Sequence, residues 1–276
     1  MATWSRIRGQ HSGKTGAFVR ACAAYCFITI PSLANAATRM KLYLLSGCVA
    51  LINNCLGQGD ACMKAAIKEL LDVAASQDME NAGQMAEVIR SSVATLSSTL
   101  IATPDPPDAS PPLYLLRGLT NAVRSYQWPK DTDLRVSLSL ALIHAISASV
   151  QDTLPYHFHA VEGNDSLYGG DPSVQHEAEE LCTSLLQDIL THIQSLTGVS
   201  EKRIGPLSLN TLWCIITWGD LNDVQMMNMA VFMWSFIIKH NRPQVITQTR
   251  DWITKRSTWL KNGQLEQFAR HINSSR

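Results

Sequence analysis

The sequence contains no complete catalytic or cofactor-binding motif. It has no G-x-S-x-G turn, which argues against the α/β-hydrolase class. The stretch Gly9–Thr15 resembles a Walker A phosphate loop but is one residue too short, and no apolar strand precedes it. The seven cysteines form no C-x-x-C pair, so their spacing gives no zinc site. These absences predict a non-enzymatic protein without a cofactor or a bound metal.

A metal-dependent enzyme remains one alternative because of His157 and His159. These histidines are separated by a single residue, and Glu162 and Asp165 follow them closely. A His-x-His pair binds a metal only where further ligands converge on it, and the sequence shows no second ligand pair. Isolated loop histidines are usually polar surface residues, so the sequence favours a binding protein over this enzyme.

No hydrophobic run in the sequence approaches membrane-spanning length. The run Ala21–Leu33 follows several basic residues and precedes Ala34-Asn35-Ala36, which fits the cleavage pattern of a secretory signal. A secreted helical protein that begins near Ala37 is therefore a second alternative. Against it, Pro31 interrupts the run and a helical apolar pattern resumes from Leu42. An odd number of cysteines in apolar segments also suits a reducing compartment better.

Charges balance over the whole chain but not locally. The first 41 residues contain six Lys or Arg and no acid, whereas residues 151–199 contain eight Asp or Glu and no Lys or Arg. Residues 200–276 contain ten basic and five acidic side chains. Alternating zones of this kind suit docking to protein partners better than nucleic acid, which would need one continuous basic face.

Apolar residues recur at helical spacing through almost the whole chain, and no segment alternates convincingly like a strand. The predicted helix over 32–56 contains Gly47 as a possible break. Helical methionines and tryptophans such as Met229 and Trp234 are expected in the core, and the segment Val224–Lys239 has so few polar residues that we expect neighbours on several sides. Further helix boundaries are predicted at Pro31, Pro111-Pro112, Thr132 or Asp133, Pro172, Pro206, Gly219, Asp223 and Pro243.

About a dozen helices with mostly short links predict an all-α fold. Pairs of about forty residues resemble the spacing of HEAT-like arrays. We therefore predict an α-solenoid of stacked antiparallel helix pairs, in which neighbours in sequence cover one another; a compact bundle is the competing architecture. The predicted organisation is a flexible basic N-terminus over residues 1–13, one solenoid segment over 14–272 and a tail over 273–276.

The longest predicted loop contains the segment Asn164–Asp171, which combines a Leu-Tyr pair, a glycine pair and two aspartates. Gly169-Gly170 permits a sharp turn, and loops on rigid elements often carry binding residues. We predict Tyr168 and Asp171 as protein-binding residues, together with Trp218 and Asp220 in a second turn. In the alternative interpretation, Tyr168 folds back to fill a groove between helices.

Three stretches together resemble one known family: Lys14–Leu33 (KTGAFVRACAAYCFITIPSL), Asn164–Asp171 (NDSLYGGD) and the Trp218–Leu221 turn. They are similar, in matching order, to the C-terminal part of the large vacuolar-protein-sorting-35-like subunit of the Retriever endosomal recycling complex. The resemblance implies an α-solenoid scaffold and not an enzyme. It also implies a cytoplasmic location with peripheral attachment to endosomes through partners.

The partners implied by the resemblance are two. The C-terminal half of such a solenoid cradles a small phosphoesterase-fold subunit of the vacuolar protein sorting 29 family, and the assembly associates with the COMM-domain (CCC) complex. The chain is much shorter than this family, so binding of the arrestin-like subunit, which attaches to the N-terminal half, is not carried over. The first helix pair is expected to present an uncovered apolar face.

Overall fold

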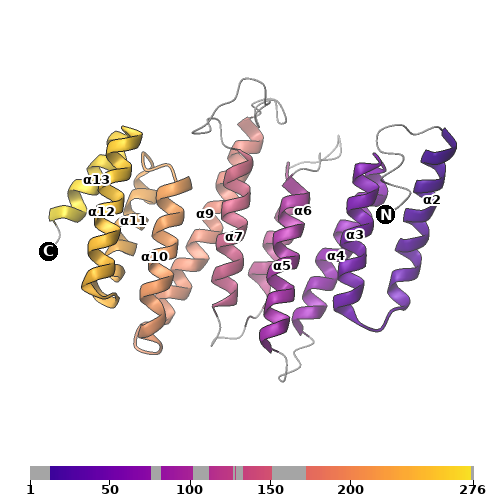
Figure 1. The fold of residues 1–276 in the computed structure, drawn as a ribbon, viewed down its shortest axis with the longest axis horizontal. Helices are drawn as coiled ribbons and strands as arrows, with labels where there is room; N and C mark the ends of the chain where they lie inside the picture. The colour runs from indigo at the N-terminus through magenta and orange to yellow at the C-terminus, as the bar shows by residue number, and fades with distance from the viewer. Residues whose placement is uncertain are drawn as a thin grey trace. The chain divides into compact units, whose positions relative to one another are not determined.

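The computed structural model describes residues 13–75, 82–101, 112–126, 128, 133–150 and 172–274, without the side chains of 74, 75, 82–85 and 149. The chain divides into two compact units, Met1–Leu181 and Cys182–Arg276. Within the described residues there are α-helices and one 3-10 turn but no strand (Figure 1). Neighbouring helices pack in pairs, so the predicted all-α solenoid fold is confirmed. The predicted single segment over 14–272 stays a prediction, and the division falls inside one continuous helix, α9.

In the first unit, helices that are close in sequence cover one another. The helix α3 packs on both α2 and α4, while α5 packs on α7 and α6 contacts α4, α5 and α7. The core of this unit is formed mainly by leucine, isoleucine and valine side chains, such as those of Leu70, Leu96 and Leu119. The elements are α2 (Gly13–Thr29), η1 (Ile30–Ser32), α3 (Ala36–Ile52), α4 (Leu56–Ala75), α5 (Ala82–Ile101), α6 (Tyr114–Ser125), α7 (Leu134–Ser149) and the start of α9 (Pro172–Ser195).

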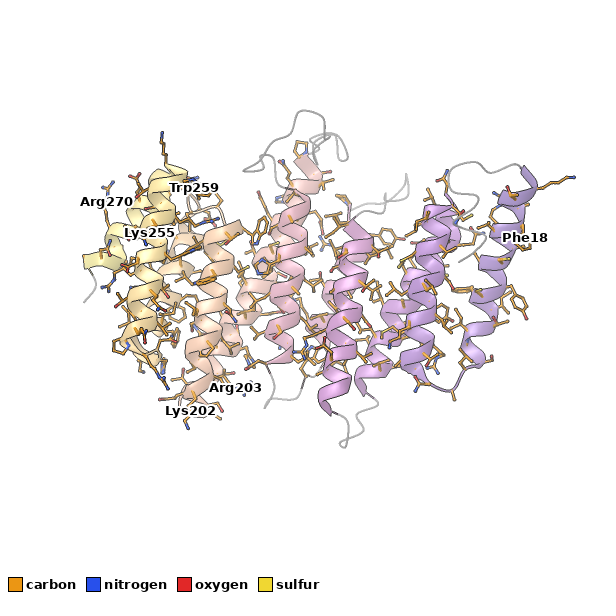
Figure 2. The ribbon with its side chains drawn as sticks, viewed as in Figure 1. Phe18, Lys202, Arg203, Lys255, Trp259 and Arg270 are labelled. Atoms are coloured by element: carbon orange, nitrogen blue, oxygen red, sulfur yellow. The ribbon has the colours of Figure 1, made fainter. Side chains whose placement is uncertain are left out.

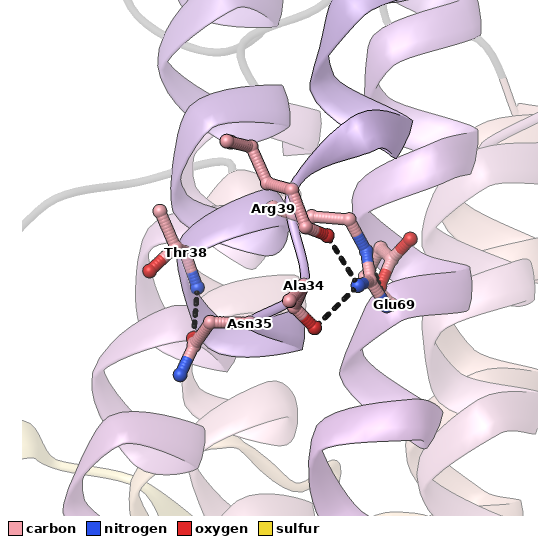
Figure 3. A network of polar contacts seen from close by, with 6 residues as sticks. Ala34, Asn35, Thr38, Arg39 and Glu69 are labelled. Atoms are coloured by element: carbon pink, nitrogen blue, oxygen red, sulfur yellow. Dashed lines mark hydrogen bonds and ion pairs between the residues drawn. The ribbon is translucent and has the colours of Figure 1, made fainter.

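The turn between η1 and α3 is fixed by polar contacts (Figure 3). The Asn35 side chain caps α3 by accepting a hydrogen bond from the Thr38 backbone N–H at 2.8 Å. The Arg39 guanidinium donates to the carbonyl oxygens of Leu33 and Ala34, and its Nη2 lies 2.7 Å from the Glu69 carboxylate on α4. One side chain therefore holds the incoming turn and the next helix together.

The second unit contains two helix hairpins, α10 with α11 and α12 with α13, and α11 also contacts both helices of the second hairpin. The core contains Trp234 and Phe268, both almost fully buried, so the expectation that Trp234 is a core residue is confirmed. Asp223 caps α11 by accepting from the backbone N–H groups of Gln225 and Met226, as predicted. The helices are α10 (Glu201–Trp218), α11 (Val224–His240), α12 (Pro243–Leu260) and α13 (Gly263–Ser274).

Two predicted helix starts are wrong. Pro206 does not open α10 but lies inside it, because the helix already begins at Glu201. The ring is on the exposed side, where the helix tolerates the loss of one backbone hydrogen bond. The second wrong start is that of α6, which begins at Tyr114 and not at the prolines before it. Leu113 takes a left-handed conformation with φ of 58°, and burial of its side chain offsets that strain.

Two further expectations are corrected by burial and packing. Gly47 does not break α3, because the helix runs from Ala36 to Ile52 and uses the missing side chain at Gly47 to approach Met63 of α4. The helix α11 is not covered on all sides, since Val224 and Phe232 are exposed while Met233 and Ile237 are buried. Apolar composition alone therefore overestimates how many neighbours a helix has.

The helix α2, the first helix that the structure describes, presents an apolar stripe to solvent, in line with the uncovered apolar face expected of the first helix pair. Phe18, Tyr25 and Ile28 are 59%, 69% and 74% exposed, and Figure 2 labels Phe18 on the outer side of this helix. The only buried residue of α2 is Ala23, which packs with Ala50 and Cys55. The run Ala21–Leu33, which imitates a secretory signal, forms the second half of α2, the η1 turn and the residue after it.

Two helical glycines provide a matched test of packing. A Cβ added to Gly205 in α10 would lie 2.8 Å from the backbone oxygen of His240, whereas one added to Gly118 in α6 would meet nothing within 4 Å. Alanine favours a helix over glycine by about 1 kcal/mol. We expect Gly118→Ala to raise the free energy of unfolding by about that amount, and Gly205→Ala to lower it because a backbone atom must shift.

Urea unfolding followed by circular dichroism measures both changes on the full chain. Equal stabilisation by the two substitutions would contradict the close approach of α10 to the end of α11.

Candidate protein-binding surface

The turn between α10 and α11 has a defined shape. The Gly219 N–H closes α10 by donating to the Ile215 oxygen at 2.8 Å. The Asp220 Oδ1 then accepts hydrogen bonds from the backbone N–H and the side-chain amide of Asn222, at 2.9 and 2.7 Å. Leu221 is buried beneath the turn, and Asp223 begins the next helix. The turn therefore holds the Asp220 carboxylate in a fixed place at the end of the α10–α11 hairpin.

Glycine is required at position 219 by close packing. A Cβ there would lie 2.7 Å from the Ile215 oxygen and 2.9 Å from Cγ of Met226. The chain thus leaves α10 and enters α11 with little freedom. A rigid corner of this kind positions a surface side chain at low entropic cost on binding.

The structure describes two of the four predicted binding residues. Asp220 is exposed, whereas Trp218 is half-buried and already engaged in a contact of its own. Trp218 is the last residue of α10 and Asp220 lies two residues later in the turn, and their role in binding stays a prediction. Tyr168 and Asp171 lie outside the described residues, as do His157 and His159 of the alternative enzyme hypothesis.

The start of α9 is tied to α6 by an ion pair. Arg117 pairs with the buried carboxylate of Glu177, and Glu180 lies 3.6 Å from the same guanidinium nitrogen. The hydrogen bond that Arg117 donates to Glu177, together with the negative charge of both carboxylates, raises the pKa of Arg117 above its ordinary value. The sequence analysis missed this pair, because Arg117 and Glu177 are sixty positions apart and no local pattern joins them.

Aromatic side chains in the second unit were also missed as surface residues. Trp213 of α10 stacks on Trp252 of α12 with ring centroids 5.1 Å apart and planes at 10°. Trp213 is 44% exposed and Trp259 is 68% exposed. A tryptophan within a helical pattern ordinarily predicts a core position, and nothing local distinguishes Trp213 from the buried Trp234.

The described residues contain few of the side-chain groups that a catalytic centre needs. In those ranges no group of three or more His, Cys, Asp or Glu side chains is placed to hold a metal ion. All seven cysteines are free. Burial raises the pKa of the Cys62 thiol to about 11 and that of Cys214 to about 12, which suppresses the nucleophilic thiolate at neutral pH. No helix in the described ranges has the length and apolar character needed to span a membrane.

Comparison with known proteins places the chain in a family. The family model for the VPS35L C-terminal domain matches residues 1–276. The chain belongs to this family. Relatives named VPS35 endosomal protein-sorting factor-like support the assignment: the Danio rerio protein is 40% identical over 252 residues, and the Rattus norvegicus protein is 38% identical over 273 residues. The Homo sapiens protein is 38% identical over 261 residues.

The match covers most of this chain but a small part of each relative. It includes 91%, 98% and 93% of the chain for the fish, rat and human proteins, but only 26%, 29% and 27% of those proteins. The chain therefore spans little more than a quarter of the length of the relatives it matches. The resemblance noted from Lys14–Leu33 and the two turn motifs is confirmed at the level of the family.

The ion pair at the start of α9 can be tested by removing one charge. We expect Glu177→Gln to lower the free energy of unfolding by about 2 kcal/mol, because a buried pair loses one partner while Arg117 keeps partial access to water. Glu179→Gln is the matched control, since Glu179 is exposed on the same helix. Thermal or urea unfolding of both variants measures the difference, and equal stability would contradict a structural role for the pair.

Cysteine reactivity provides a second test. Cys22 is exposed on α2, whereas Cys62 and Cys214 are buried and have raised thiol pKa values. Under native conditions at pH 8, we expect iodoacetamide to modify Cys22 early and these two only after denaturation. Peptide mass spectrometry over a time course identifies the sites. Early modification of Cys62 would contradict the packing of α3 against α4.

Proposed function

We propose that the chain is a non-enzymatic scaffold segment of an endosomal sorting assembly, and that it binds a small phosphoesterase-fold subunit of the vacuolar protein sorting 29 family. The observation that carries this proposal is the family match over the whole chain, residues 1–276. The stacked helix pairs support it, because such arrays expose rows of helix ends and turns that suit protein binding. The scaffold needs no cofactor or metal.

The proposal includes a place in the cell. The relatives are named as endosomal protein-sorting factors, so we place this chain at the cytoplasmic side of endosomes, attached peripherally through its partners. There it supports the recycling of cargo from endosomes to the plasma membrane in association with the COMM-domain (CCC) complex. The alternating charge zones of the sequence favour several protein partners over one nucleic acid.

The contact residues that we propose for the phosphoesterase-fold subunit are Tyr168, Asp171, Trp218 and Asp220. For Asp220, support comes from the turn geometry: the carboxylate is exposed and held by Asn222. A fixed carboxylate at a turn can accept charge-assisted hydrogen bonds from a partner without first losing side-chain freedom. For Tyr168 and Asp171, the support is the sequence of the loop alone.

Binding of the purified phosphoesterase-fold subunit tests the proposal. Isothermal titration calorimetry with the full chain is expected to show a stoichiometric complex, and Asp220→Lys is expected to weaken it about tenfold by placing a like charge against a basic group of the partner. Glu179→Lys makes the same change of charge at an exposed position of α9 and is expected to bind as the unmodified chain does. A folded, monodisperse chain that does not bind would refute the proposal.

A further inference from the structure

A surface of the second unit combines tryptophan rings with unpaired positive charge. It consists of Trp213 on α10 and Trp252, Lys255, Arg256 and Trp259 on α12, and we call it the tryptophan face. The stacked rings of Trp213 and Trp252 join the two helices, and the guanidinium carbon of Arg256 lies 5.4 Å from the centroid of the Trp252 ring. Figure 2 labels Lys255 and Trp259 on α12.

The helical spacing explains why these side chains share one surface. Trp252, Arg256 and Trp259 follow one another at steps of four and three residues, which places them along one side of α12. The buried residues of the same helix are Thr249, Ile253 and Ser257, which repeat every four positions along a different stripe. Trp259 is therefore not part of the core, and its large exposed indole costs solubility unless something covers it.

The positive charges of the tryptophan face have no carboxylate partner within the described part of the chain. Lys255 is exposed, and the neighbouring Asp251, one helical turn earlier, is not at ion-pair distance from it. The Nε atom of Arg256 is buried and has no hydrogen-bond acceptor. In the same unit Arg270 does pair with Glu266. A guanidinium group without a carboxylate partner can form charge-assisted hydrogen bonds with an incoming carboxylate.

We propose that the tryptophan face is a docking surface for an acidic segment of a partner protein, in which carboxylates flank an aromatic or long aliphatic side chain. The carboxylates pair with Arg256 and Lys255, and the apolar side chain packs on the indoles of Trp259 and Trp213. Tryptophan and arginine are the residues most enriched at the energetic centres of protein interfaces. This surface is distinct from the α10–α11 turn and does not depend on the function proposed above.

A protein segment fits this surface better than a nucleic acid does. Single-stranded nucleic acids stack their bases on free aromatic ring faces and follow a continuous basic groove. Here the ring of Trp252 already contacts both the Trp213 ring and the Arg256 guanidinium, and the face contributes only Lys255 and Arg256 as cations.

Fluorescence anisotropy with a labelled model peptide tests the proposal. The probe contains two phenylalanines separated and flanked by pairs of glutamates, and we expect saturable binding to the full chain that weakens as salt is added. We expect Arg256→Gln to weaken binding about tenfold and Trp259→Ala about fivefold. Peptides with glycine in place of phenylalanine, or lysine in place of glutamate, are expected to bind at least about tenfold more weakly.

The control variants change similar side chains elsewhere. Arg270→Gln removes an exposed arginine of α13, and Tyr25→Ala removes an exposed aromatic ring of α2; both are expected to leave peptide binding unchanged. Circular dichroism verifies that each variant is folded, which is expected at Trp259 because the side chain is exposed. Oligouridine RNA and vesicles of phosphatidylserine with phosphatidylcholine are measured in parallel.

Three outcomes overturn the proposal. The first is the absence of saturable peptide binding at concentrations up to about 1 mM. The second is equal binding by the unmodified chain and the Arg256→Gln and Trp259→Ala variants. The third is binding of the RNA or the vesicles through these residues in place of the peptide, which would assign the face to a different class of ligand.

Discussion

The fold depends on the burial of each helix's apolar stripe by helices that are close to it in sequence. A single helix as short as those of this chain is not stable in water by itself, so packing against neighbours provides most of the free energy that stabilises each helix. The hairpins α3–α4, α10–α11 and α12–α13 meet this requirement locally, and contacts such as those of α4 with α6 extend it within the unit. The Arg39–Glu69 and Arg117–Glu177 pairs then fix where successive elements meet. In a fold of this kind every helix pair keeps an exposed side, and that side is available for binding partners.

The sequence predicted the parts of the fold that depend on local chemistry. Asp223 and Pro243 mark helix starts correctly because capping and a missing N–H act within one turn. The helix start predicted at Pro206 is wrong, because the same missing N–H is tolerated on the exposed side of a helix that is already formed. The stacked pair of Trp213 and Trp252 was not predictable, since it depends on the register between helices that are far apart in sequence. The site was predictable to a similar extent: the turn shape at Asp220 follows from its residues, while the Arg117–Glu177 pair does not.

The family assignment and the geometry support the proposed function in different ways. Membership of the VPS35L C-terminal domain family identifies the kind of molecule. The geometry supports two surfaces as candidates for binding: a rigid turn with one exposed carboxylate, and a face with indole rings and cations that have no carboxylate partner among the described residues. These two surfaces differ in charge, so they would select partners of opposite character. A scaffold with both could hold two different proteins at once without competition between them.

The shallow burial of α2 has a dynamic consequence. With Ala23 as its only buried residue, α2 contributes little apolar area to the unit, so the free energy needed to detach it is much smaller than that needed to unfold α3 and α4. The backbone amides of α2 are therefore expected to exchange with solvent through local opening. Exchange of the amides in α3 and α4 requires a larger unfolding event.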